Sequence, residues 1–407
     1  MTDPVITVTG VGLVTPAGIG AEATWRGVCA GTGTARRDPS LAGMPVDISC
    51  TVPDFDPARH VGRRSTLMHD RFVQLAVVAA REAVADAHLD PGSWDGARVG
   101  VVIGCGLGGV CTWERQHLAF LNGGPESVSA LLIPMIIPNM VAGHLSIEFH
   151  ATGPSFVTAT ACASGATAIG CAQELLSDGR CDVVIAGGSE AGVNPLIVTG
   201  FAQMGALSRR VAEPGTASRP FDAERDGFVV AEGSGMLILE RESDALARGV
   251  RPRARLAGYG ASADAAHMTA PDPEGTAVKQ AMGAALAQAG LAPSEVDHVN
   301  AHGTSTRLND VVETRAVQSL LGTRPSVTSA KGVTGHAFGA AGAIEAALTV
   351  LTVQHATVPP TANLTTQDPG IELDVVAGAP RSQPVQVAMS NSFGFGGQNA
   401  VLVFTAA

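Results

Sequence analysis

Residues 161–176 read ACASGATAIGCAQELL, and residues 331–351 read KGVTGHAFGAAGAIEAALTVL. Both stretches are rich in alanine and glycine, with larger apolar residues at the spacing of a helix. A strand-like apolar run precedes each of them, at residues 149–160 and 327–329. Two stretches that each follow a strand and continue as a small-residue helix suggest that one α/β unit occurs twice in the chain.

The rest of the chain has the same alternation of strands, glycine turns and helices. In the first half we expect a helix at 71–87 and strands at 5–9 (turning at Gly10 and Gly12), 98–103, 182–186 (closed by Gly187 and Gly188) and 235–240. In the second half we expect a helix at 276–288 and strands at 254–258, 296–300, 385–390 and 399–404. Strands that alternate with helices predict parallel sheets covered on both faces. We therefore expect an α/β chain in two halves, 1–250 and 251–407.

The composition excludes several classes of protein. The chain has 407 residues, of which 45% are hydrophobic and only 15% charged, so it is not disordered and must bury a large core, in part at a subunit interface. Its 26 Lys and Arg against 37 Asp and Glu give a net charge of −11, with no dominant basic block. A sequence-independent nucleic-acid binder needs a basic face, so we expect no nucleic-acid partner.

The cysteines and the apolar segments indicate a cytoplasmic protein. Seven cysteines are an odd number, and none forms a CxxC pair, so we expect reduced thiols with neither a disulfide framework nor a zinc site. The N-terminal MTDPVITVTG has no basic or apolar region of a signal peptide. The longest charge-free stretches contain prolines and hydroxyl side chains, and we expect them to be buried protein rather than membrane spans.

Cys162 is the first candidate for a reactive group. It lies between a predicted strand and a helix of small residues. At the N-terminus of a helix the positive end of the dipole lowers the pKa of a thiol, and small neighbours let a substrate approach. The alternative is a buried structural thiol, the more common state of a free cysteine.

Two histidines are further candidates. His302 follows a predicted strand in NAHGTST, and His336 lies in KGVTGHAFGAAG, five residues after Lys331. Each histidine taken alone is more often part of a core than a catalyst, and no Glu follows His298, so the HExxH zinc motif is absent. A thiol and two histidines at strand ends nevertheless indicate an active site, because open α/β sheets place their sites there.

Two glycine-rich motifs have more than one interpretation. GCGLGG at 104–109 fits the dinucleotide fingerprint G-x-G-x-x-G, but the required acidic residue is missing, since Glu126 lies in a turn. We therefore favour a tight turn near a cleft. GFGG at 394–397 offers backbone N–H groups for half of an oxyanion hole, or forms a simple β-turn.

Four blocks resemble the signature blocks of the β-ketoacyl-acyl-carrier-protein synthases: TACASG, HGTST, SAKGVTGHAFGAAG and NSFGFGGQN. Segments such as ASRPFDAERDGF and AEGSGMLILE match as well, so the resemblance extends over nearly the whole chain. The most similar type is the elongating synthase of fatty-acid synthesis, together with the ketosynthase subunit of type II polyketide synthases. Membership implies a thiolase-like fold, with two stacked βαβαβ halves in five layers, usually as a dimer.

The resemblance also implies roles for individual residues. Cys162 matches the acyl-accepting nucleophile, and His302 and His336 match the histidines of malonyl decarboxylation, which Lys331 supports electrostatically. Asp310 and Glu313 match supporting acids, and Thr304 and Thr306 match the threonines that bind the pantetheine arm. Phe395 matches a gating aromatic, and Leu107 matches the residue at the mouth of the acyl pocket.

The implied reaction is a decarboxylative Claisen condensation, which makes the chain an acyltransferase. An acyl group on the cysteine reacts with malonyl-acyl-carrier protein, and a 3-oxoacyl-carrier protein is formed. The loss of CO₂ supplies the driving force, so the resemblance implies no metal or redox cofactor, only substrates on the phosphopantetheine of a carrier protein.

The chain departs from the family pattern in two loops. Arg307 and Asn309 replace the usual Pro and Gly after the second threonine, which puts contacts with partner or substrate in question. Leu131 and Leu132 stand where elongating synthases often carry aromatics, in a segment that normally lines the neighbouring subunit's pocket. Leu132 is therefore a candidate substrate-binding residue, and we expect a roomier acyl tunnel.

Carrier docking needs a local basic patch, because carrier proteins are acidic and so is this chain. The candidates are Arg63, Arg64, Arg209 and Arg210. The alternative is a solvated arginine face without a partner.

Other proteins of related type fit less well. A non-catalytic chain-length partner subunit lacks the nucleophile, whereas Cys162 is present here. A thiolase needs a second cysteine near the C-terminus, and no cysteine follows Cys181. The composition and the HGTSTRLND variant favour polyketide synthesis, with a chain-length partner, over housekeeping fatty-acid elongation. The starter, the chain length, and homodimer versus heterodimer stay open.

Overall fold

The computed structural model describes residues 4–407, so the first three residues of MTDPVITVTG lie outside the described residues. Within residues 4–407, twelve strands form one mixed sheet. From its centre outward, the first half contributes β1 (Ile6–Thr15), β8 (Glu232–Arg241), β7 (Val183–Ala191), β5 (Val99–Gly104) and β6 (Ser155–Thr158). The second half contributes β9 (Ala254–Ala263), β16 (Gln398–Thr405), β15 (Val387–Gly394), β10 (His298–Asn300) and β11 (Ser326–Thr328), with β13 (Asp374–Val375) outside them. The short β2 (Gly18–Ile19) pairs with β1.

The strand order confirms the duplication. In chain order within each half, the five strands lie 1-5-4-2-3 from the centre to the edge. The halves meet where β1 pairs with β9 in antiparallel register, with Ile6 opposite Leu256. We propose that the chain divides between residues 250 and 251, in the connection to β9.

The alternation of strands and helices had predicted parallel sheets, whereas the sheet is mixed. In each half the second, third and fourth strands are parallel, but β8 and β16 run antiparallel to both of their neighbours. For β15 and β16 the reason is the tight turn at 395–397, because a connection this short joins only antiparallel strands.

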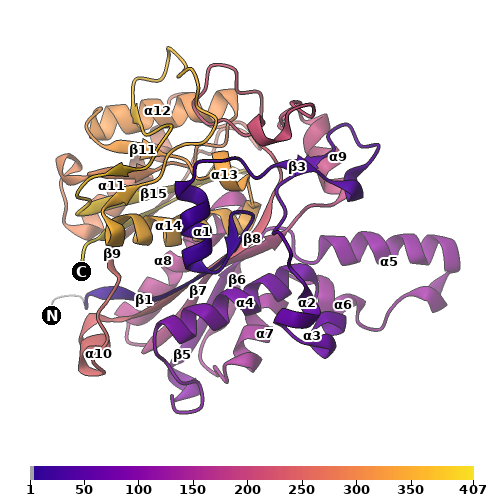
Figure 1. Ribbon diagram of the computed structural model, residues 1–407. Coiled ribbons are helices and arrows are strands. Elements are labelled where there is room, and N and C mark those ends of the chain that lie inside the picture. Colours follow the sequence, from indigo (N-terminus) through magenta and orange to yellow (C-terminus); the bar gives the residue numbers. More distant parts are fainter. Residues whose placement is uncertain (1–3) are drawn as a thin grey trace.

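Helices and sheet halves alternate in five layers, as expected for the thiolase-like fold (Figure 1). The outer helices α4 (Arg71–Asp86) and α7 (Met140–Glu148) cover the first half of the sheet, and α11 (Thr276–Ala289) and α12 (Arg307–Leu321) cover the second. Between the halves lie α8 (Ser164–Ser177) and α14 (Ala341–His355), which contact strands of both. The two stretches of small residues therefore form the central layer.

The two central helices begin in the same way. A 3₁₀ turn at Ala161–Ala163 precedes α8, and a 3₁₀ turn at Phe338–Ala340 precedes α14. The first residue of each turn has a left-handed backbone, with φ of 50° at Ala161 and 45° at Phe338. Cys162 and Gly339 are thus equivalent positions of the two halves.

Several glycines that the sequence suggested as turns lie inside strands. Strand β1 continues through Gly10 and Gly12, where a Cβ atom would lie 2.0 Å from the carbonyl oxygen of Ala83 and 1.8 Å from that of Ala79 on α4. Strand β7 likewise continues through Gly187 and Gly188. These glycines allow helices and neighbouring strands to approach closely, which is a different use of glycine from the turns we expected.

The remaining elements lie around these layers, and one of them, α13, is buried along its whole length. They are α1 (Ala21–Cys29), α2 (Pro57–His60), α3 (Arg63–Met68), α5 (Val110–Gly123), α6 (Leu132–Ile136), α9 (Pro195–Gln203), α10 (Glu242–Ala247), α13 (Lys331–Thr334) and the strand pairs β3 (Arg36–Arg37) with β4 (Ile48–Ser49) and β12 (Thr357–Val358) with β14 (Arg381–Ser382). Across residues 4–407 no helix combines the length and the apolarity needed to cross a bilayer.

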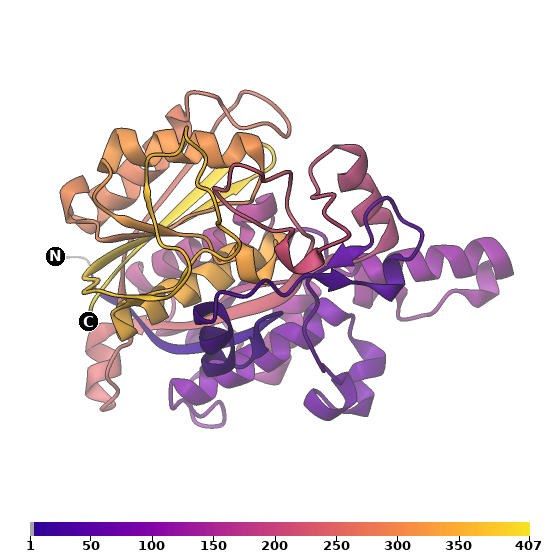
Figure 2. The same ribbon diagram turned by 45° about the horizontal axis from the view of Figure 1, so that its top comes forward.

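Helix α5 projects from the body of the protein in both views (Figures 1 and 2). Its exposed apolar side chains include Trp113, Leu118, Phe120 and Leu121. Strand β6 ends the sheet on the side of the first half, and Phe156 on it is also exposed. The exposed apolar side chains of α5 and the open edge of β6 are not part of the hydrophobic cores of the single chain.

Candidate active site

One cavity of about 350 Å³ brings together six of the candidate catalytic and substrate-binding residues. They are Cys162, His302, His336, Thr304, Thr306 and Phe395. Four phenylalanines complete much of the apolar wall, namely Phe201, Phe228, Phe338 and Phe393. Residues from both halves of the chain therefore meet at a single site.

Cys162 lies in the 3₁₀ turn that leads into α8. Ser164 holds this turn, because its hydroxyl accepts from the N–H of Thr160 (2.9 Å) and donates to the carbonyl of Ala161 (2.6 Å). The GFGG segment packs against the same turn, since a Cβ atom on Gly394 would lie 2.4 Å from the carbonyl oxygen of Thr160, and the backbone N–H of Phe395 favours the thiolate of Cys162. GFGG is thus both the turn of the β15–β16 hairpin and a wall of the site.

The thiol does not have the lowered pKa that its place before a helix suggested. Burial raises the pKa of Cys162 to about 11, and neither the charge of Lys331 nor the Phe395 N–H compensates for it. The earlier expectation was wrong because the loss of water outweighs the favourable dipole. The side chain is only half-buried, however, and it faces the cavity, so a substrate can reach it.

The two histidines face each other across the cavity. Their ring centroids are 5.5 Å apart and the planes are nearly perpendicular, at 84°. The backbone of His336 is fixed by Val229 and Ala231, and the edge of Phe228 packs against its ring at 5.2 Å. Burial, and then the charge of Lys331, lower the pKa of both imidazoles well below the usual range. Both rings are therefore neutral at pH 7 and able to donate an N–H.

Lys331 orients His302. Its buried Nζ donates to the carbonyl of His302 (2.6 Å), lies 3.4 Å from Nδ1 of the same residue and forms an ion pair with Glu345. An ammonium next to Nδ1 makes that nitrogen an acceptor, so the ring proton belongs on Nε2. Burial raises the pKa of Glu345 to about 7. The sequence analysis missed Glu345, although an acid in the apolar run AAGAIEAALTVL was a visible signal.

The two supporting acids on α12 are buried and hold backbone rather than substrate. Glu313 accepts from the N–H groups of His302 and Gly303, both at 2.8 Å, and burial raises its pKa to about 7. Asp310 accepts from the N–H of Phe221 at 2.9 Å. Glu313 therefore fixes the loop that carries His302, and Asp310 fixes the neighbouring loop that contains Phe221.

A second buried acid missed in the sequence is Glu190. It accepts from the N–H groups of Gly106 (2.6 Å), Leu107 (3.1 Å) and Gly339 (3.2 Å), and burial raises its pKa to about 7. The GCGLGG turn thus surrounds a carboxylate of the protein itself. Its N–H groups are not free for a phosphate, which agrees with the rejection of the dinucleotide interpretation.

Other candidate residues lie away from the cavity. Leu107 lines a second hollow of about 370 Å³ with Val110, Trp113 and Ile136, whereas Leu132 lines neither hollow. Arg63 and Arg64 begin α3. Figure 1 places α3 and the segment after α9, which carries Arg209 and Arg210, in different parts of the molecule, so the four arginines do not form one patch on a single chain.

Arginines 209 and 210 lie near the mouth of the cavity. The N–H of Arg209 donates to Asp226, which lines the cavity, and the guanidinium of Arg210 pairs with Glu224 at 2.8 Å. The two departures from the family pattern, Arg307 and Asn309, line the same mouth. Among residues 4–407 no three or more His, Cys, Asp or Glu side chains cluster as metal ligands.

Comparison with known proteins decides the family. A family model for the N-terminal domain of β-ketoacyl synthases matches residues 3–245, and one for the C-terminal domain matches residues 253–365. The chain belongs to the β-ketoacyl synthase family. A curated member, the 3-oxoacyl-[acyl-carrier-protein] synthase 2 of Synechocystis sp., is 43% identical over 406 residues and aligns with 98% of this chain and 97% of its own length. The family resemblance is thus confirmed, and the chain is an acyltransferase of the condensing type.

Solved β-ketoacyl synthases have the same fold. A chain from a type II polyketide synthase acyl-carrier protein in complex with its ketosynthase, bound to the hexaketide, matches with a TM-score of 0.93 and 33% identity over the full length of both chains. A chain of the ishigamide ketosynthase/chain length factor matches with a TM-score of 0.92 and 33% identity, again over both full lengths.

The raised thiol pKa predicts the pH dependence of Cys162 alkylation. Only the thiolate reacts, so with a pKa of about 11 the rate of modification by iodoacetamide should rise about tenfold per unit from about pH 7 to pH 10. Peptide mass spectrometry resolves Cys162 from the other six cysteines, and Cys162→Ala identifies the background. A plateau at or below about pH 8 contradicts the raised pKa.

Proposed function

We propose that this β-ketoacyl synthase condenses an acyl group on Cys162 with malonyl-acyl-carrier protein, with loss of CO₂, to form a 3-oxoacyl-carrier protein. The single observation that supports this most is that Cys162, His302 and His336 line one cavity, where the backbone N–H of Phe395 favours the thiolate of Cys162. A nucleophile, an oxyanion donor and two neutral N–H donors are what the two half-reactions need.

In the first half-reaction the sulfur of Cys162 attacks the acyl thioester of the carrier. The new S–C bond forms first and gives a tetrahedral oxyanion, which the N–H groups of Cys162 and Phe395 stabilise. The bond to the carrier sulfur then breaks, and the proton of the thiol goes to the departing thiolate. Because the resting thiol is protonated, its ionisation is coupled to the arrival of the substrate.

In the second half-reaction the histidines bind the malonyl thioester. Nε2–H of His302 and an N–H of His336 donate to its carbonyl oxygen, where negative charge collects as the bond to the carboxylate breaks and CO₂ leaves. The resulting carbanion attacks the acyl-Cys162 carbonyl. The sulfur of Cys162 leaves and regains a proton, and the product remains on the carrier. The roles of Thr304 and Thr306 are to hold the pantetheine arm, with their hydroxyls 2.9 Å apart in the cavity.

A second subunit completes the proposed assembly. The apolar side chains of α5 and the open edge of β6 offer a surface for it. One similar structure is a ketosynthase/chain length factor and another contains an acyl-carrier protein. We propose a dimer, either of two identical chains or with a chain-length partner, which receives its substrates on an acyl-carrier protein.

For the pathway we propose type II polyketide synthesis. Arg307 and Asn309 at the mouth of the cavity support it, because they differ from the usual residues of elongating synthases at the point where substrate enters. The alternative is fatty-acid elongation. It is favoured by the higher identity to a 3-oxoacyl synthase 2, 43% against 33% for the polyketide ketosynthases. Product analysis with each kind of carrier protein distinguishes the two.

Intact-mass analysis tests the proposed reaction. A panel of acyl-carrier thioesters, with and without a candidate partner subunit, should add one acyl group to the protein and none to Cys162→Ala. His302→Ala and His336→Ala should still be acylated but lose malonyl decarboxylation by about 10²–10³-fold, the usual effect of removing one donor to an oxyanion. Acylation of Cys162→Ala, or full decarboxylation by both histidine variants, contradicts the proposal.

Substitution of Leu132 tests the acyl tunnel. Leu132 lies in α6 and outside the cavity of its own chain, so we propose that it lines a roomier tunnel in the adjoining subunit. Leu132→Phe should shift products by about one elongation step toward shorter chains, because the ring fills apolar space. The control is Leu246→Phe, exposed on α10. Unchanged product lengths in chain-length profiling refute the assignment.

Charge reversal tests carrier docking. We propose Arg209 and Arg210 as the docking residues, since they adjoin the mouth of the cavity. Their joint change to Glu should raise the KM for malonyl-carrier protein about tenfold and leave that for malonyl-pantetheine unchanged. Arg63→Glu with Arg64→Glu forms the second arm, which tests the other predicted pair. A pair whose reversal leaves the carrier KM unaltered is not a docking site.

A further inference from the structure

The turn that carries His302, Thr304 and Thr306 is strained. The backbone has positive φ at Gly303 (37°) and at Ser305 (68°), and the second of these is not a glycine. Such a conformation persists only where the surroundings hold it. The threonine hydroxyls can keep one orientation in the cavity only if another part of the chain supports this turn.

A loop at residues 218–227 provides that support. The N–H of Arg219 donates to the hydroxyl of Ser305 at 2.9 Å, and the N–H of Gly227 donates to the carbonyl of Ser305 at 3.0 Å. The strained residue is therefore held on both its side chain and its carbonyl by one loop.

The side chain of Arg225 supports the next two residues of the turn. Its Nε donates to the carbonyl of Thr306 and its Nη2 to the carbonyl of Arg307, both at 3.1 Å. A planar guanidinium that binds two successive carbonyls restricts the peptide plane between them, and so the direction of the Thr306 side chain.

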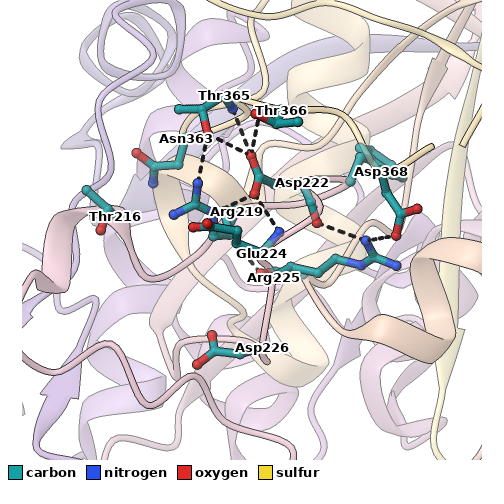
Figure 3. Close-up of polar contacts among 12 residues, drawn as sticks. Thr216, Arg219, Asp222, Glu224, Arg225, Asp226, Asn363, Thr365, Thr366 and Asp368 are labelled. Carbon is teal, nitrogen blue, oxygen red and sulfur yellow. Dashed lines mark hydrogen bonds and ion pairs between the residues drawn. The ribbon is translucent and has the colours of Figure 1, made fainter. Parts of the chain in front are cut away.

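Arg225 is itself held firmly in the protein. Only 2% of it is exposed, and its Nη1 donates to the carbonyl of Asp222 (2.9 Å) and to the carboxylate of Asp368 (2.7 Å), as Figure 3 shows. Nε also lies 3.4 Å from the carboxylate of buried Asp310. Each of its three nitrogens thus donates to an acceptor of the protein, and Arg225 does not line the cavity.

Arg219 lies beside it in the same loop but acts elsewhere. Its guanidinium pairs with Asp222 (2.9 Å) and donates to Thr365 (2.9 Å), and it makes no side-chain bond to residues 302–307 (Figure 3). With 5% exposure it is as deeply buried as Arg225. Unlike the side chain of Arg225, that of Arg219 does not contact the carbonyls of Thr306 and Arg307.

We propose that Arg225 is a positioning residue, which fixes Thr306, and through its hydroxyl Thr304, in the orientation that binds the pantetheine arm. This inference rests on the proposed function, in which the two threonines hold that arm. Arg225 touches neither substrate nor reacting atoms. Its loss should therefore weaken substrate binding through the arm without impairing the sulfur of Cys162.

Kinetics of Arg225→Lys, with Arg219→Lys as the matched control, test the inference. Lysine keeps the charge but lacks the planar guanidinium that holds the two carbonyls in a fixed geometry, so we expect the KM for malonyl-pantetheine to rise about tenfold with kcat within about twofold. Acylation of Cys162 by p-nitrophenyl hexanoate, which has no pantetheine arm, should keep its rate. Arg219→Lys should change neither quantity, and thermal unfolding compares the stability of the two variants.

Two further variants make every outcome decisive. Asp368→Asn, at a partly exposed partner of Arg225, should raise the same KM by about twofold to threefold even if Arg225→Lys does not fold. In a Thr304→Val, Thr306→Val background, Arg225→Lys should add less than about twofold, since the hydroxyls it positions are gone.

The results separate this inference from the proposed function. If the threonine variant leaves the KM for malonyl-pantetheine unchanged, the arm assignment fails and the inference fails with it. If the threonine variant raises that KM but Arg225→Lys and Asp368→Asn do not, only the inference is overturned. The inference is also overturned if Arg225→Lys slows the acylation of Cys162 by p-nitrophenyl hexanoate as much as it slows the reaction with malonyl-pantetheine, because an equal loss indicates general damage to the active site.

Discussion

The close contact between the two central helices determines where the site can form. A Cβ atom on Gly165 of α8 would lie 2.6 Å from the backbone nitrogen of Ala343, and one on Gly342 of α14 would lie 2.9 Å from that of Ala166. No larger residue fits at either position without separating the helices. Because α8 begins just after Cys162 and α14 just after the loop of His336, this contact brings the thiol and His336 to one cavity, and β10 brings His302 to the same place. It also accounts for the alanine and glycine in both stretches.

Burial then sets the chemical state of the groups that meet there. It raises the pKa of the Cys162 thiol and lowers the pKa values of both imidazoles, so that the neutral forms of these three groups are favoured in the cavity. The ammonium of Lys331 stays beneath them, bound to the carbonyl of His302. A largely buried site with a few fixed N–H groups strengthens each hydrogen bond to charge that develops during a reaction.

The sequence analysis predicted the features that depend on local pattern and missed those that depend on contacts between distant segments. The helix at 71–87, the two small-residue helices and the duplicated order follow from periodicity and were confirmed. Gly10 and Gly187 were misassigned as turns because the reason for a glycine there is a neighbouring element, which no local pattern reveals. Arg225 and Glu190 have partners 81 to 149 residues away along the chain, so their positions gave no sign of what they hold.

The equivalence of Cys162 and Gly339 limits what a duplicated scaffold can do. A side chain at Gly339 would place its first carbon 2.6 Å from the nitrogen of Gly106 and 2.7 Å from the carboxylate of Glu190. The second half is thus sterically closed to a nucleophile at this position. In the reaction that we propose, each chain therefore holds one acyl group at a time, on Cys162, and a lengthened product leaves on its carrier and returns to a cysteine before the next extension. Repeated growth is then a shuttle between two proteins rather than a relay within one.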